Sequence, residues 1–112
     1  MLFIETRTFS KLLPAYLSDE DLLLLQEYLL QQPDAGSLIR GSGGLRKIQW
    51  AGDLKNRHKG KSGGVRIIYF WKKTADEIWL LTVYSKSERA NISTKDLKEI
   101  SRNLKDDESQ SW

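Results

Sequence analysis

The chain has 112 residues, of which 39% are hydrophobic and 29% charged, a composition typical of one globular domain. It contains no cysteine, which excludes disulfides, cysteine-based zinc sites and thiol nucleophiles. Its longest apolar runs, Leu22–Leu25 and Ile67–Trp71, are too short to cross a bilayer, and its first residues lack the pattern of a signal peptide. We therefore expect a cytoplasmic protein that contacts no membrane, with one domain over residues 1–105 and a polar tail over 106–112.

The positive charge is concentrated in the middle of the chain. Residues 46–73 carry nine basic side chains and one acidic, a net charge of +8, whereas residues 1–45 have a net charge of −3 and residues 74–112 of −2. A solvated loop is the common explanation of a lysine and arginine run, but here the basic residues alternate with strand-forming apolar ones. The distribution therefore favours a positive face that binds a polyanion, and RNA is the first candidate.

The N-terminal third is predicted to form one short strand and two helices. Leu2–Ile4 are strong strand formers. Over Phe9–Leu17 the apolar residues follow the helical period, although Pro14 limits this helix to a few turns. Ser18 and the three acidic residues after it are typical of a helix start, and this second helix is expected to end at Gln32, before a proline.

The remainder is predicted to form three strands and a final helix. The strands are expected at Leu45–Trp50, Val65–Lys72 and Ile78–Tyr84, with a long basic loop over 51–64 between the first two. Ser93 caps a last helix with helical apolar spacing. The order β-α-α-β-β-β-α indicates an α+β fold in which the N-terminal helical hairpin covers one face of a central antiparallel sheet of about four strands. The other face then remains for function.

Two glycine-containing segments do not meet the requirements of a phosphate-binding loop. Gly60-Lys61-Ser62 resembles the end of a Walker A motif, but Lys55 stands where that motif needs a glycine. Neither this segment nor Gly41–Gly44 joins a strand directly to a helix. His58 is the only histidine, so a metal site would have to be built from scattered carboxylates. We expect neither a metal nor a cofactor, and His58 is kept as a candidate for a phosphate contact or proton transfer.

The remaining candidates for chemistry are basic side chains that alternate with aromatic ones. Basic groups give affinity for phosphates, and aromatic rings stack on unpaired bases. Aromatic residues on strands are more often part of the core, which we expect of Trp79 and of at least one of Trp50 and Trp71. The basic candidates are Arg46, Lys47, Lys55, Arg57, Lys59, Lys61, Arg66, Lys86 and Arg89.

Three segments occur in an order that points to a known family. They are Gly41–Lys47, Gly63–Trp71 and Leu80–Glu88. With them the chain resembles the HigB-type toxins of the RelE/ParE superfamily, the toxin half of type II toxin–antitoxin pairs. The resemblance implies a RelE-like fold and an enzyme that cleaves messenger RNA on the ribosome without a metal ion, thereby inhibiting protein synthesis. It also implies a cognate antitoxin of the helix-turn-helix type, through which alone the toxin would associate with operator DNA.

The resemblance also implies site residues. Lys47 and Arg66 occupy the positions of two basic catalytic residues of RelE-type enzymes, whereas Gln49 replaces a second lysine. Because the RNA 2′-hydroxyl can attack the adjacent phosphorus, such a site needs only a base, a clamp for the phosphorane and an acid. Arg66 is the candidate clamp and Lys47 the candidate base, with Tyr84, Lys86 or a loop lysine as acid. The expected RNA-binding set is Arg46, Lys55, Arg57, His58, Lys59, Lys61 and Arg89.

Three other functions stay open on the sequence alone. A ParE-like member of the same superfamily would inhibit DNA gyrase instead of cleaving RNA. A non-catalytic module would bind ribosomal or structured RNA with strong salt dependence and without cleavage. A degenerate toxin would retain only the antitoxin as its partner.

Overall fold

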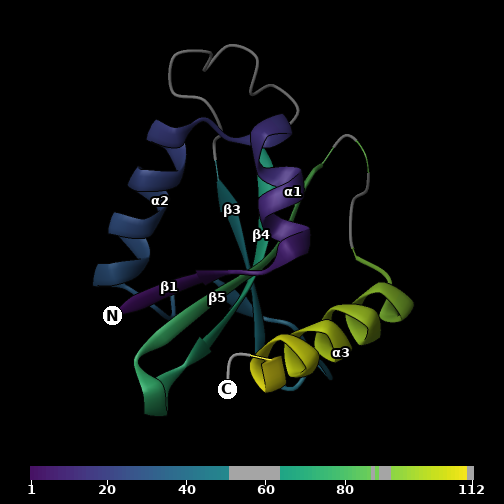
Figure 1. Cartoon of the computed structure of the whole chain (residues 1–112). Helices are drawn as coiled ribbons and strands as arrows, with labels where there is room; N and C mark the ends of the chain where they lie inside the picture. Colours follow the sequence, from purple (N-terminus) through teal and green to yellow (C-terminus); the bar gives the residue numbers. More distant parts are fainter. Residues whose placement is uncertain (51–63, 87, 89–91, 111–112) are drawn as a thin grey trace.

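The computed structural model describes residues 1–50, 64–86, 88 and 92–110 (Figure 1). The described chain contains three α-helices, five strands and one short 3₁₀ turn. In chain order they are β1 (Leu2–Glu5), α1 (Arg7–Tyr16), α2 (Asp19–Gln31), β2 (Ser37–Leu38), β3 (Leu45–Trp50), β4 (Val65–Lys72), η2 (Lys73–Ala75), β5 (Glu77–Ser85) and α3 (Thr94–Gln110). The α+β class predicted from the sequence is confirmed.

The five strands form one sheet in the order β1-β5-β4-β3-β2. β3, β4 and β5 make the antiparallel meander that the sequence predicts, and the bounds of β3 and β4 are those expected. The prediction of about four antiparallel strands needs two corrections. β1 pairs parallel with β5. A tight hairpin turn would make two strands antiparallel, but β1 is followed by the helices α1 and α2 instead. β2 has only two residues, too few to give a periodic signal, and pairs antiparallel with β3.

α1 and α2 begin at residues whose side chains cap the helix. Thr6 Oγ1 accepts a hydrogen bond from the backbone N–H of Phe9 at 3.2 Å, so α1 starts before the first residue of the apolar period. Ser18 and Asp21 form a reciprocal capping box in which each side chain accepts from the other residue's backbone N–H. Both helices pack their apolar side chains against the same face of the sheet, as the predicted hairpin requires.

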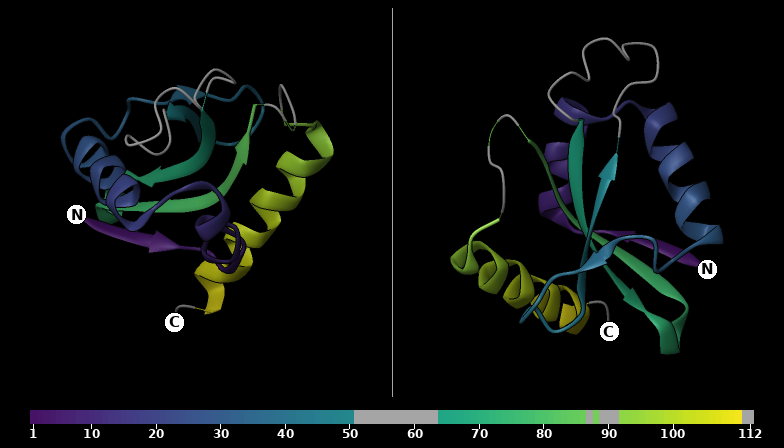
Figure 2. Two further views of the ribbon diagram at one scale, coloured as in Figure 1. Left: turned by 90° about the horizontal axis from the view of Figure 1, so that it is seen from above. Right: turned by 180° about the vertical axis from the view of Figure 1, so that it is seen from behind.

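The sheet separates two clusters of buried side chains. One lies between the sheet and the helices α1 and α2, and it includes Phe9, Leu25 and Tyr69. The other lies beneath α3 and includes Ile68 and Trp79, of which Trp79 was predicted to be core. In both views of Figure 2, α2 and α3 lie on opposite flanks of the molecule. Each face of the sheet is therefore covered over part of its area by a different part of the chain.

α3 begins after Ser93, whose Oγ accepts a hydrogen bond from the backbone N–H of Asp96 at 3.1 Å. It continues to Gln110, past the boundary at residue 105 that the sequence suggests. Although α3 is the longest of the described helices, neither it nor any other helix in the described ranges is long and apolar enough to span a membrane.

Candidate functional site

Strand register brings four polar side chains onto one face of the sheet. Gln49 on β3 lies opposite Arg66 on β4, and Arg66 lies opposite Tyr84 on β5. Lys47 lies opposite Ile68, two residues further along the same strands. Residues directly opposite one another in neighbouring strands point to the same side of the sheet. We refer to this group of Lys47, Gln49, Arg66 and Tyr84 as the β3–β5 site; it lies on the face that also carries α3.

A bulge in β5 aligns Tyr84 with Arg66. The pairing between β4 and β5 skips Leu81, so the alternation of side chains along β5 changes phase at that residue. Before the bulge, Leu80 packs into the cluster beneath the two N-terminal helices, and after it Tyr84 packs on the opposite face. Strict alternation from Leu80 would place Tyr84 on the helix side. The bulge therefore completes the β3–β5 site.

Arg66 is the buried cation of this site. Its side chain is 9% exposed, and its Nη1 atom has no hydrogen-bond partner among the described residues. A buried donor without a partner costs about 1–3 kcal/mol, and more when it is charged. The planar guanidinium can donate to two oxygens of one phosphate. The β3–β5 site thus contains a buried guanidinium whose shape suits a phosphate and whose Nη1 has no partner among the described residues.

Arg66, Lys47 and Gln49 line a pocket of about 390 Å³ at the outer edge of β3. The two residues of β2 pair only with Arg46 and Lys47, so within the described chain β2 does not cover the rest of that edge. The described lining contains two cations and no carboxylate, which favours an anionic ligand. The lining residues are Tyr28, Ala35, Ser37, Lys47, Ile48, Gln49, Trp50 and Arg66.

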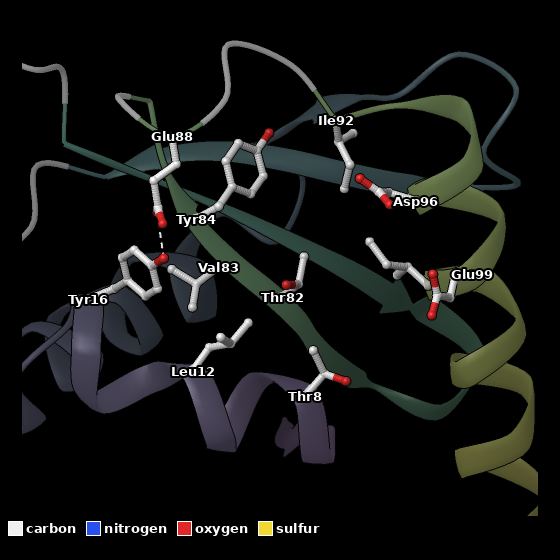
Figure 3. Close-up of a pocket in the computed structure, with 11 residues that line it drawn as sticks. Thr8, Leu12, Tyr16, Thr82, Val83, Tyr84, Glu88, Ile92, Asp96 and Glu99 are labelled. Carbon is white, nitrogen blue, oxygen red and sulfur yellow. Dashed lines mark hydrogen bonds between the residues drawn. The ribbon is translucent and has the colours of Figure 1, made fainter.

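A second pocket, of about 280 Å³, is lined by Tyr84 and lies between α1, β5 and α3 (Figure 3). Three of its lining residues are acidic: Glu88, Asp96 and Glu99. Within the described ranges, no three His, Asp or Glu side chains are grouped as a metal site requires. The carboxylates make this pocket unfavourable for a phosphate, so the two pockets on either side of the Arg66–Tyr84 pair differ in charge.

Glu88 holds the turn that carries Lys86. Its Oε1 atom accepts hydrogen bonds from Tyr16 Oη on α1 and from the backbone N–H and Oγ of Ser85, the last two at 3.1 and 2.9 Å. Figure 3 shows the bond between Tyr16 and Glu88 as a dashed line. Lys86 itself is exposed, two residues after Tyr84 in the chain. The turn is therefore fastened to α1, and Lys86 is accessible at the end of the strand that contributes Tyr84.

Arg46 lies on the opposite face of β3 and has a structural role. Its Nη1 donates hydrogen bonds to the backbone oxygens of Asp34 and Gly36 at 3.1 and 2.7 Å. Beside it, Tyr69 Oη accepts from the N–H of Gly36 and donates to the oxygen of Pro33, both at 2.8 Å. Burial raises the pKa of Tyr69 above its ordinary value of 10.0. Both side chains hold the segment after α2 against the sheet, and the assignment of Arg46 to the RNA-binding set stays a prediction from the sequence.

The other expected RNA-binding residues lie outside the described residues. They are Lys55, Arg57, His58, Lys59, Lys61 and Arg89. Their assignment therefore stays a prediction from the sequence.

The structure also reveals a basic groove that the sequence did not indicate. It lies between the turn at residues 40–43 and α3, and its described lining includes Arg40, Lys98 and Arg102 but no acidic residue. Arg40 is about sixty positions away from the other two in the chain, and the C-terminal third has a net negative charge. Charge counting along the sequence therefore could not detect the groove; only the packing of α3 brings these side chains together.

Comparison with known proteins supports the fold. No family model matches the chain. Among solved structures, a double arginine-to-alanine mutant of the E. coli toxin RelE in its free state is similar, with a TM-score of 0.54 and 16% sequence identity. The similarity covers 80% of this chain and 86% of that one. At this identity the likeness establishes the fold, and the RelE-like fold expected from the sequence is confirmed.

Proposed function

We propose that the protein is the HigB-type toxin of a type II toxin–antitoxin pair and that it cleaves messenger RNA on the ribosome. Its likeness in fold to the toxin RelE supports the toxin class. The observation that carries the nuclease assignment is Arg66, a buried cation in a pocket whose described lining has no carboxylate. Its Nη1 has no partner among the described residues, and a bound phosphate would offset that cost.

The proposed reaction is an intramolecular phosphoryl transfer within the RNA. The 2′-oxygen of one nucleotide forms a bond to the adjacent phosphorus, and the bond from that phosphorus to the 5′-oxygen of the next nucleotide breaks. A proton leaves the 2′-hydroxyl and another is delivered to the 5′-oxygen, which gives a 2′,3′-cyclic phosphate and a 5′-hydroxyl. Because the RNA supplies the nucleophile, the reaction needs neither a metal ion nor a cofactor.

The geometry supports distinct roles for the site residues. Arg66 is the proposed clamp, because its fork can hold two oxygens of the phosphorane, and removing such a group typically costs roughly 10²–10³-fold in rate. Lys47, next along the same face, is the proposed general base. Tyr84, opposite Arg66, and Lys86, exposed beyond the end of the strand, are the proposed proton donors. Gln49, also opposite Arg66, is in a position to orient the ribose.

The proposed partners follow from this function. The ribosome and its messenger RNA are the substrate complex, and a cognate antitoxin of the helix-turn-helix type neutralises the toxin in the cytoplasm. Contact with operator DNA takes place only through the antitoxin complex. Ribosomal RNA is the proposed partner of the basic segment over residues 51–63 and of Arg89, because multiple phosphate contacts supply salt-sensitive affinity.

The test is induced expression of the chain alone in bacteria, with growth measurement and mapping of transcript 5′ ends. The unmodified chain is expected to stop growth and to produce new 5′ ends within translated regions. Arg66→Ala and Lys47→Ala are expected to restore growth and to remove those ends.

Matched controls are Arg7→Ala and Lys73→Ala, which delete the same types of charge at exposed positions outside the pocket. They should behave like the unmodified chain. Full growth arrest with intact transcripts and induced DNA damage would instead support a gyrase poison. Unchanged cleavage in both Arg66→Ala and Lys47→Ala would overturn the assignment of the site.

A further inference from the structure

A basic groove lies between the turn at residues 40–43 and α3, and the proposed reaction at Arg66 uses none of its residues. The right-hand view of Figure 2 shows this turn beside α3. The groove has a volume of about 640 Å³, and its described lining contains three cationic side chains and no carboxylate. The lining residues are Arg40, Gly41, Ser42, Gly43, Thr94, Leu97, Lys98, Ser101 and Arg102.

α3 separates its charges between two sides of the helix. The five groove residues on α3 follow the spacing i, i+3, i+4, i+7 and i+8, which places them along one stripe. Asp96 and Glu99 lie outside this stripe and line the pocket towards α1 instead, as Figure 3 shows. The carboxylates of α3 whose side chains the structure describes therefore face away from the groove, and the groove favours an anionic ligand.

The turn at residues 40–43 forms a fixed wall of the groove. Ser42 Oγ donates a hydrogen bond to the backbone oxygen of Ile39 at 2.6 Å and accepts one from the backbone N–H of Leu45 at 3.0 Å. Ile39 and Leu45 also pack with Leu97 of α3 in one apolar cluster. Both walls of the groove are thus anchored in the same part of the core, and the exposed Arg40 is carried by a turn of defined geometry.

Two glycines leave the backbone of this turn open to a ligand. Gly41 and Gly43 have φ angles of 73° and 77°, a conformation that favours glycine. A Cβ atom at either position would have no heavy atom of the described chain within 4 Å, apart from the adjacent residues. A phosphate can therefore approach the turn closely, as it does at other glycine-containing anion sites.

Strand β3 connects the groove with the β3–β5 site. Leu45 packs beneath α3, and Lys47 points to the same side of the sheet because it is two residues further along the strand. The two positions are roughly 7 Å apart along the strand. An RNA strand with one phosphate at Arg66 can therefore reach the groove within a few nucleotides. This continuity favours RNA over an acidic segment of a protein as the ligand.

We infer that the groove binds the sugar-phosphate backbone of the RNA strand that is cut, a few nucleotides away from the cleaved bond. Arg40, Lys98 and Arg102 contact its phosphates. The hydroxyls of Thr94 and Ser101 donate to phosphate or ribose oxygens. The inference rests on the proposed function and extends it, because the groove holds the strand while the β3–β5 site acts on one phosphate. Contacts to the backbone fix the register of the strand without reading its bases.

The test is the affinity of the purified protein for a labelled single-stranded RNA of about twelve nucleotides, measured by fluorescence anisotropy between about 50 and 200 mM salt. The groove variant is Arg40→Ala/Lys98→Ala/Arg102→Ala, which removes three exposed side chains and should keep its thermal unfolding midpoint. Each phosphate contact contributes about −0.7 to the slope of log affinity against log salt, so the slope should become shallower by about 2 in the groove variant. The unmodified protein should therefore lose roughly 20-fold more affinity over this salt range than the groove variant.

Two control variants separate the groove from charge in general. Arg7→Ala/Lys11→Ala/Lys73→Ala removes three exposed cations outside the groove and should leave the slope as it is. Arg40→Lys/Arg102→Lys keeps the charges of the groove and should also keep the slope.

Two further ligands test the class and the length of the occupant. A dinucleotide is too short to reach the groove from Arg66, so the unmodified protein and the groove variant should bind it equally. Polyglutamate, which carries negative charge without phosphates, should compete for the groove far less than the RNA does.

The outcomes separate this inference from the proposed function. An unchanged slope in the groove variant, or competition by polyglutamate as strong as that by RNA, would overturn the groove as an RNA site, and the nuclease would stand if expressed protein still cuts transcripts. If the slope changes as expected while expressed protein cuts no transcripts, the groove stands and the nuclease assignment is overturned.

Discussion

At the scale of single residues, Arg66 shows a conflict between stability and function. Its side chain is 9% exposed and, among the described residues, it has no partner for Nη1. Proteins rarely bury a charge without a partner unless the charge serves a ligand. Lys47, Gln49 and Tyr84 on the same face create the setting in which a phosphate can use it.

Because Arg66 is buried with an unpartnered Nη1, we predict that Arg66→Met stabilises the free protein and abolishes cleavage. Methionine fills a similar volume without a buried charge, so the free energy of unfolding should rise by about 1 kcal/mol. Urea denaturation of both proteins measures the change. Arg7→Met, at an exposed position, is the control and should change stability by less than about 0.5 kcal/mol. A large loss of stability in Arg66→Met would show that the arginine is a structural residue.

A second prediction concerns the contribution of Tyr69 to the free energy of unfolding and how this contribution depends on pH. Tyr69→Phe leaves the buried N–H of Gly36 without its acceptor and should lower the free energy of unfolding by about 2 kcal/mol at neutral pH. Because burial raises the pKa of Tyr69 above 10.0, the unfolded chain loses this proton at a lower pH than the folded one. The contribution of the Tyr69 phenol to the free energy of unfolding is therefore complete below about pH 10 and is lost as the pH rises further.

Denaturation curves of the two proteins between pH 8 and about pH 11 check this prediction. The stability difference between them should be constant up to about pH 10 and become smaller above it. A difference that is independent of pH over the whole range would contradict the role given to the phenol.

At the scale of elements, the sequence predicts strands better than their arrangement. The apolar and basic alternation in β3 and β4 gives their bounds correctly, because every side chain there has a defined face. The face itself depends on register, which pairs Gln49 with Arg66 and is invisible in a single strand. The bulge at Leu81 is likewise set by packing, and without it the position of Tyr84 would be misassigned. Thus the sequence, through its family resemblance, could propose Lys47 and Arg66 as site residues, but it could not identify their neighbours in space.

The turn after β5 yields a prediction at this scale. Glu88→Ala removes the acceptor that fastens the turn to Tyr16 and Ser85, so Lys86 should lose its fixed position. Because small displacements of catalytic groups are costly, messenger RNA cleavage should fall by roughly tenfold or more. Cleavage assays together with ¹⁵N relaxation of the Lys86 amide measure the two effects. A rigid turn with reduced cleavage would assign Glu88 a direct role, and full cleavage with a mobile turn would exclude Lys86 from the chemistry.

At the scale of the whole molecule, the positive charge is concentrated at particular sites, although the net charge is small. The net charge is only +3, yet the pocket at the β3–β5 site and the groove at Arg40, Lys98 and Arg102 have no carboxylate in their described linings. Three acidic side chains, Glu88, Asp96 and Glu99, line instead the pocket between α1, β5 and α3. Such segregation suits a protein that must place one phosphate of a long polyanion at a defined point.

In the proposed reaction, Arg66 acts on the phosphate of a messenger RNA held by the ribosome. The most direct measurement is the single-turnover rate at which purified protein cleaves a labelled messenger on purified ribosomes, compared with that of Arg66→Ala. We predict cleavage by the unmodified protein to a 2′,3′-cyclic phosphate, and a rate at least roughly 10²-fold lower for Arg66→Ala. Equal rates for the two proteins, or no cleavage by either, would contradict the proposed role of Arg66 in cleavage.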